Sequence, residues 1–310
     1  MANEETQWDR STLLIVRSSI AAGALLSCIL VFILDAAFTC RDKDARKLPT
    51  LRLILYITLA SIARSIIIII QVSPVLDSSL HHNDMYCVTT GYLYRTVSMM
   101  GILFTLTATV HMLLVTFAVK YSWKFEVGYV LVSIILPLTY TWIPFTYDKA
   151  LLQGWCSVST NDTCHQLQWG IIYNADIPRL IVEAINTFLV IVTLSCGMPR
   201  RCIQMKKDGE EIGVLMKQVL PILVHSVFYL GINWFSLTDH LRNGTCSSHG
   251  KGIQLAHAIT SAGRGLLVGI TFSAYYFIIL YIRWKHQNAT VDVYGTISAS
   301  SSLTDSQKIN

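Results

Sequence analysis

The chain has 310 residues, of which 53% are hydrophobic and only 14% are charged, with a mean hydropathy of +0.49 and a formal net charge of +5. So few charged residues cannot cover the surface of a water-soluble fold of this length, which excludes that class and favours a membrane protein. The basic residues stand in short segments beside apolar runs, a pattern typical of membrane orientation. We therefore expect a lipid membrane around the chain and no nucleic acid as a partner.

In chain order, the polar and acidic residues 1–11 lack the basic start of a cleavable signal peptide, so we expect a short extracellular N-terminus. A membrane-spanning helix needs about 20 mostly apolar residues. Windows of that kind follow at 12–36, 51–74, 88–118, 127–147, 170–197, 214–237 and 256–283. The sequence thus predicts an all-α fold, a seven-transmembrane helix bundle over residues 12–284, with a disordered cytosolic tail over 285–310.

The charges of the connecting segments predict how these helices are oriented. The connections assigned to the cytosol are rich in basic residues: Arg41, Lys43, Arg46, Lys47, Lys120, Lys124, Arg200, Arg201, Lys206 and Lys207. The connections on the other side hold only Lys149, Arg242 and Lys251. Because basic loops remain in the cytosol, this bias places the N-terminus outside the cell and the C-terminus inside, in a multi-pass protein of the plasma membrane.

Two glycosylation sequons agree with this orientation. Asn161-Asp-Thr163 and Asn243-Gly-Thr245 lie in segments assigned to the outside, so Asn161 and Asn243 are expected to carry glycans. A third sequon, at Asn288, lies in the tail and should stay unmodified.

Four cysteines also lie on the predicted outer side, an even number in an oxidising compartment: Cys87, Cys156, Cys164 and Cys246. A bridge between Cys87, at the start of the third span, and Cys156, in the loop after the fourth, would tie that loop across the mouth of the bundle. Whether Cys164 pairs with Cys246 stays open, because sequence does not fix connectivity.

Several of these features resemble G-protein-coupled receptors. An outer cysteine opens the third span, and its candidate partner follows in Gly154-Trp155-Cys156. The second span, from Leu53, ends in an intramembrane Arg64, and Asn186 follows Pro178 by eight residues in the fifth. The seventh span contains the glycine stretch 265–269, and Phe104-Thr105-Leu106 lies in the third.

These motifs are similar to the secretin/adhesion and cyclic-AMP-receptor-like superfamily, whereas the motifs that close the third and seventh spans of rhodopsin-like receptors are absent. The resemblance implies a polar network that includes Arg64 and Asn186. It also implies a heterotrimeric G protein as partner, with arrestin as a second partner for the Ser/Thr-rich tail. We therefore expect a receptor rather than an enzyme.

Ionisable side chains at membrane depth usually face the interior of a bundle and are paired or functional. Polar residues recur at helical spacing on the fifth and sixth spans, and one interpretation is a polar cavity, open to the outside, that binds an anionic small ligand through arginine side chains. Its candidate contacts are Arg95, Arg179, Arg264, Asp176, Glu183, His225 and Tyr229.

A structural interpretation explains the same residues without a ligand. Glu183 and Arg179 would pair along one helix face, Arg64 would join helices, and His225 would be an ordinary core histidine. Scattered histidines such as His111 and His225 do not form a zinc-binding motif, and residues 256–283 hold no lysine for a Schiff base. We expect no metal, cofactor or catalytic residue. The main alternative function is a seven-span transporter of a small polar solute.

Overall fold

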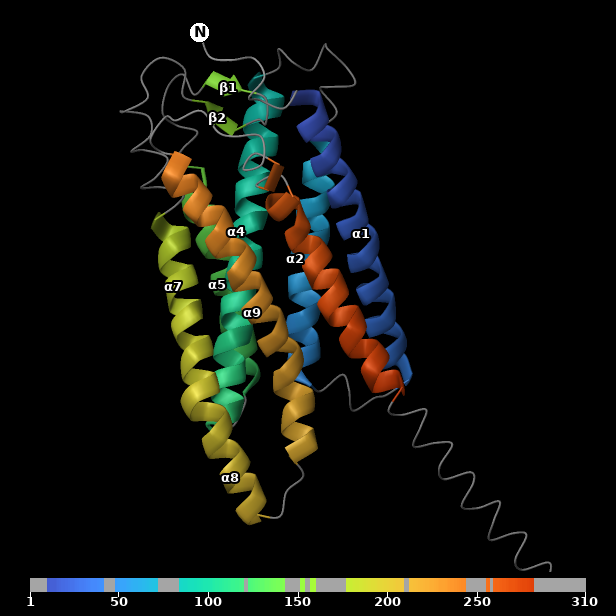
Figure 1. Cartoon of the computed structure of the whole chain (residues 1–310), viewed down its shortest axis with the longest axis vertical. Helices are drawn as coiled ribbons and strands as arrows, with labels where there is room; N and C mark the ends of the chain where they lie inside the picture. Colours follow the sequence, from blue (N-terminus) through green and yellow to red (C-terminus); the bar gives the residue numbers. More distant parts are fainter. Residues whose placement is uncertain are drawn as a thin grey trace, which may run out of the picture.

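The computed structural model describes residues 10–41, 48–71, 84–119, 122–142, 151–153, 157–159, 177–208, 212–243, 255–256 and 259–281. Its helices are α1 (Arg10–Arg41), α2 (Pro49–Ile70), α4 (Asp84–Thr116), α5 (Trp123–Tyr140), α7 (Ile177–Val192), α8 (Met198–Asp208) and α9 (Ile212–Asn243). A π-helix, η6 (Thr193–Gly197), joins α7 to α8. A last helix, Ile259–Tyr281, is the red-orange helix of Figure 1.

Five of these helical segments are long and apolar enough to cross a membrane: Ile15–Cys40, Pro49–Ile70, Thr89–Thr116, Ile177–Asp208 and Ile259–Tyr281. Large apolar side chains point outward from the bundle, such as Leu26 at 69% exposure and Phe188 at 64%. Lipid solvates such side chains at no cost, whereas water would not. The structure thus confirms a membrane-embedded bundle that is mainly helical. Helix α5 has 18 residues and the apolar part of α9 is the shorter Gln218–Trp234, so the count of seven crossings stays a prediction.

The fifth predicted helix extends beyond its expected end. Residues 198–208, predicted to form a basic loop, continue the chain as α8. Lys206 and Lys207 stand in its last turn, where positive charge is favourable. The basic residues therefore extend a helix out of the bundle instead of forming a flexible connection.

A short hairpin, which the sequence analysis did not predict, lies at the opposite end of the bundle from α8 (Figure 1). Strands β1 (Leu151–Gln153) and β2 (Ser157–Ser159) pair antiparallel, with Leu151 opposite Ser159. We refer to the two ends of the bundle as the hairpin end and the α8 end. Helix α1 begins at the hairpin end, and α7 and the last helix also run from it towards the α8 end, whereas α2 and α9 run the other way.

Helix α4 is the central helix, because it packs against α2, α5, α7 and α9. Helix α1 packs on α2, and the last helix closes the bundle against both. Its Gly265 lies between Ala24 of α1 and Ser65 of α2, and the Cys28 thiol donates a 3.2 Å hydrogen bond to the Gly265 carbonyl. Small residues allow this close approach of helix backbones, which drives association in lipid.

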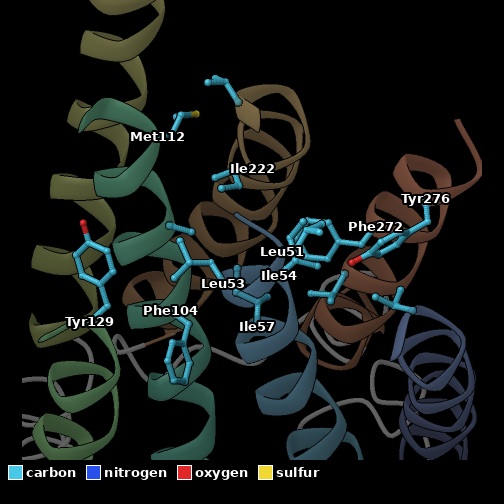
Figure 2. Close-up of a cluster of buried hydrophobic side chains, with 14 of the residues drawn as sticks. Leu51, Leu53, Ile54, Ile57, Phe104, Met112, Tyr129, Ile222, Phe272 and Tyr276 are labelled. Carbon is cyan, nitrogen blue, oxygen red and sulfur yellow. The ribbon is translucent and has the colours of Figure 1, made fainter. Parts of the chain in front are cut away.

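The main apolar core lies where α1, α2, α4, α9 and the last helix meet. Figure 2 shows Leu53 and Ile57 of α2 between Phe104 of α4 and Ile222 of α9, with Phe272 of the last helix beside them. Lipid tails are as apolar as these side chains, so shape complementarity and hydrogen bonds hold the helices together rather than exclusion of water.

Candidate functional site

Four arginines lie in the hairpin-end half of the bundle on four different helices, and we call them the arginine cluster. They are Arg17 of α1, Arg64 of α2, Arg179 of α7 and Arg264 of the last helix. Arg17, Arg64 and Arg264 are buried, and the Arg179 side chain is 12% exposed. Burying charged groups in this way is costly, so a cluster of four demands a specific arrangement of partners.

Arg64 binds two other helices. Its Nε donates to Ser98 Oγ at 3.0 Å, and its Nη2 donates to the Tyr94 hydroxyl at 3.0 Å and to the backbone carbonyl of Ser261. The planar guanidinium places several donors in fixed directions, which suits it to joining α2, α4 and the last helix at once. Arg64 therefore connects three helices within the cluster.

Tyr94 of α4 lies beside two of the arginines. The Arg17 guanidinium carbon is 5.1 Å from the centre of the Tyr94 ring, and that of Arg64 is 5.3 Å from it. The electron-rich face of the ring attracts both cations, which offsets part of their mutual repulsion. One aromatic side chain thus lies against two arginine side chains.

Arg179 connects α7 to α9. Its Nε donates to Glu183 Oε1 at 2.8 Å, one turn along the same helix, and its Nη2 donates to the backbone carbonyl of Asn233 at 3.2 Å. Glu183 is 1% exposed, so this ion pair is shielded from solvent and strengthened by its surroundings. The structure thus brings the predicted residues Arg179 and Glu183 into direct contact.

Arg264 of the last helix is buried near other members of the cluster. It is close enough to Arg64, Arg179, Tyr94 and Tyr229 to interact with them electrostatically. The last helix therefore adds a fourth arginine to the same interior region.

One buried carboxylate accompanies the arginine cluster in the described part of the chain. Asp35 and Glu183 are the two buried carboxylates there. Asp35 is 18 residues beyond Arg17 on α1, about 27 Å further along the helix, and its Oδ1 accepts a hydrogen bond from Tyr276. Glu183 is thus the one buried carboxylate among the described residues that lies beside the arginines.

Deeper in the bundle, α7 and α9 present polar atoms that make no hydrogen bond within the described residues. They are Glu183 Oε2, Asn186 Oδ1, Asn233 Nδ2 and both ring nitrogens of His225. All four side chains are at most 3% exposed. We call this set the α7–α9 polar face.

His225 lies away from the arginines, among aromatic rings. Its ring centre is 5.4 Å from that of Tyr229 and 4.9 Å from that of Phe272 in the last helix. One turn along α9 from Tyr229, its neighbour Ser226 shares a 3.0 Å hydrogen bond with Thr109 of α4. His225 is therefore the member of the α7–α9 polar face on α9 that lies nearest the α8 end.

Arg95 follows Tyr94 on α4 and is partly buried. Successive helical residues differ in direction by about 100°, so the two side chains leave the helix in different directions. Five further predicted residues lie outside the described residues: Asp176, Cys156, Cys164, Cys246 and Asn161. Cys87 and Asn243 lie in described helices, but their side chains are outside the description.

Sequence reasoning missed three members of the site. Arg17 had a usable signal, because it is an arginine inside the first apolar window. Tyr94 and Ser98 had none, since neutral polar residues are common in spanning helices and only the tertiary contact with Arg64 distinguishes these two.

A second polar contact lies towards the α8 end. Glu126 of α5 accepts a 3.0 Å hydrogen bond from the Tyr56 hydroxyl and forms a 2.7 Å ion pair with Arg52, both on α2. The Arg52 side chain is 38% exposed, so solvent and headgroups screen this pair more than the one on α7. Within the described residues, no group of three His, Cys, Asp or Glu side chains is arranged to hold a metal ion.

A comparison with protein-family models finds no family that matches the chain, and a comparison with curated proteins finds no matching sequence. The functional assignment therefore rests on the geometry of the arginine cluster and the α7–α9 polar face.

Proposed function

We propose that the protein is a seven-span membrane receptor, with its N-terminus outside the cell, that binds a small anionic ligand at the arginine cluster and activates a heterotrimeric G protein. The carrying observation is the gathering of four arginines from four helices within one half of the bundle, three of them buried. An anion that bridged these helices would accept forked hydrogen bonds from their guanidinium groups.

Helices α5 and α9 supply the two crossings beyond the five long apolar helices. Both are apolar over most of their described length and pack against α4 in the same bundle. An odd number of crossings places the two termini on opposite sides. The basic α8 supports a cytosolic α8 end, because Arg200, Arg201, Lys206 and Lys207 follow the rule that cytosolic connections are positive.

Ligand binding at the hairpin end would favour one arrangement of the helices over another. Arg64, Arg179 and Arg264 belong to three helices that continue to the α8 end, so a ligand that draws them together acts on the whole bundle. The G protein would dock between α8 and the start of α9, opposite the ligand.

The proposal is tested with the full-length protein in nanodiscs together with a purified G protein. Succinate, acetate and inorganic phosphate serve as probes, with chloride at the same ionic strength as the reference. We expect at least one organic anion or phosphate to raise the melting temperature and to accelerate guanine-nucleotide exchange. Stabilisation without exchange, combined with uptake of the same anion into proteoliposomes, would instead identify a transporter.

Two substitutions distinguish binding at the arginine cluster from a general effect of the protein's charge. Arg264→Gln removes a positive charge from the centre of the cluster and should abolish the stabilisation by anions. Lys124→Gln removes an equal charge from an exposed position at the start of α5 and should leave it unchanged. If both variants respond as the parent protein does, the arginine cluster is not the ligand site.

A further inference from the structure

We propose that the ligand carries, next to its anionic group, a hydrogen-bond donor such as a hydroxyl or amino group, which makes it a small hydroxy acid or amino acid. This inference rests on the proposed function and deepens it. It follows from two buried acceptors of the α7–α9 polar face next to the arginine cluster, Glu183 Oε2 and Asn186 Oδ1.

Glu183 contacts the arginine cluster, through Arg179, and belongs to the α7–α9 polar face. Its Oε1 accepts the hydrogen bond from Arg179, whereas its Oε2 makes none within the described residues. The side chain is 1% exposed. A buried carboxylate oxygen without a donor costs more free energy than a neutral acceptor in the same position, so the site favours an occupant that donates to it.

Asn186 provides a second acceptor one turn deeper. Its Oδ1 also makes no hydrogen bond within the described residues, and the side chain is 3% exposed. Glu183 and Asn186 are three residues apart on α7, so they share one face of the helix and point in similar directions. An ammonium group on the ligand could donate to both acceptors, and a hydroxyl group could donate to one of them.

Helix α9 brings its own polar atoms to the same interior. Arg179 donates to the Asn233 backbone carbonyl, which fixes α9 against α7 at the level of the cluster. His225 lies two turns deeper on α9, fully buried, with neither ring nitrogen hydrogen-bonded within the described residues. A neutral imidazole has one donor and one acceptor, so it would accept from, or donate to, a hydroxyl group.

The order of these groups selects the ligand. The arginines offer positive charge, and Glu183, which accepts a hydrogen bond from Arg179, is the acceptor beside them. A simple amine could donate to the acceptors but has no acid group for the arginines. A molecule with an acid group and a donor on the adjacent carbon satisfies both regions at once, because its acid group faces the arginines while its donor reaches Glu183 and Asn186.

Matched probes test this inference on the full-length protein in nanodiscs. Propionate, lactate and alanine share one carbon skeleton and differ only in having hydrogen, hydroxyl or ammonium next to the carboxylate; succinate, malate and aspartate repeat the comparison with two carboxylates. We expect the hydroxyl or ammonium member of at least one series to bind roughly tenfold more tightly than its hydrogen counterpart, the gain from one hydrogen bond to a charged group. Apparent affinity is read from the melting temperature against concentration.

An Asn186→Leu variant assigns the preference to the polar face. It replaces the amide with an apolar side chain of similar volume and leaves the arginine cluster intact. We expect this variant to bind propionate and succinate as the parent protein does, while losing the preference for the hydroxyl or ammonium members.

Each other outcome has a defined meaning. Equal binding within both series would overturn the donor inference and leave the anion site standing. No stabilisation by any member, relative to chloride, would overturn the proposed function as well. A preference that survives Asn186→Leu would overturn the contact with Asn186 and leave Glu183 as the acceptor of the ligand's donor.

Discussion

Gly269 of the last helix lies directly against Ser27 of α1. A β-carbon built at Gly269 would stand 2.1 Å from the Ser27 Oγ and 2.3 Å from its Cβ, closer than any two such atoms approach. The two helices can therefore adopt this spacing only with glycine at this position. Nearer the α8 end, a hydrogen bond between Asp35 and Tyr276 joins the same two helices. This hydrogen bond depends on the close spacing at Gly269.

Gly269→Ala should destabilise the protein for this reason. Added volume in a tightly packed interface costs about 1–3 kcal/mol, because one helix must shift. Gly263→Ala is the matched control: it lies on the same helix, nothing stands within 4 Å of its added β-carbon, and alanine is the better helix former. Melting in detergent should show a lower midpoint for Gly269→Ala alone. Equal midpoints would mean that the two helices do not pack at this distance.

Glu183→Gln should destabilise the protein far more than Glu126→Gln. Both changes remove one carboxylate charge from an ion pair with arginine, but Glu183 is 1% exposed and its partner 12%, whereas Arg52, the partner of Glu126, is 38% exposed. Breaking a buried pair leaves an uncompensated charge and costs about 3 kcal/mol or more, while an exposed pair contributes roughly 0–1 kcal/mol.

The comparison is made by melting both variants in the same detergent, and a double-mutant cycle at each pair isolates the coupling. Coupling energies of the same size would show that the Arg179–Glu183 pair is solvated, contrary to its burial.

Tyr94 should contribute through its ring as well as through its hydroxyl. Tyr94→Phe removes the 3.0 Å hydrogen bond to Arg64 but keeps the ring beside Arg17 and Arg64, so it should cost about 1 kcal/mol. Tyr94→Leu removes the ring too and should cost about 1–2 kcal/mol more, since two cations lose their aromatic partner. Equal midpoints for the two variants would show that the ring contributes nothing to holding these charges.

Glycan attachment should report the orientation of the chain. When the protein is expressed in eukaryotic cells, removal of N-linked glycans should increase its electrophoretic mobility, and Asn161→Gln combined with Asn243→Gln should abolish that increase. Asn288→Gln should have no effect. A glycan at Asn288 would place the tail outside and the arginine cluster on the cytosolic side, which is incompatible with an extracellular ligand.

The long apolar helices could be predicted from the sequence because lipid requires about 20 apolar residues in a row, and this signal is local. Helix ends have a weaker signal. The charge of residues 198–208 predicts a loop, whereas the structure continues the helix through them, with two lysines in its last turn. The β1–β2 hairpin was missed because three-residue strands have no detectable period.

The site was partly predictable for a similar reason. Arginines at membrane depth stand out in a sequence, and Arg64, Arg179 and Arg264 were identified in this way. The residues that contact these arginines are determined by the tertiary fold. The contacts of Arg64 with Ser98 and Ser261 join residues 34 and 197 positions apart, and no local pattern distinguishes those serines from others.

The π-helix η6 affects the rotational orientation of α8 relative to α7. Its last backbone bond runs from Met198 N–H to the Thr193 carbonyl, five residues back, so the turn contains one residue more than an α-helical turn. Gly197 fits against Thr116 there, where a β-carbon would be 2.5 Å from the threonine hydroxyl. If this turn tightened to ordinary α-helical winding, α8 would swivel by about 100° about its own axis while Arg179 and Glu183 stayed in place. A one-residue slip at η6 would thus change which side chains of α8 face a given direction at that end of the bundle, without any helix having to tilt.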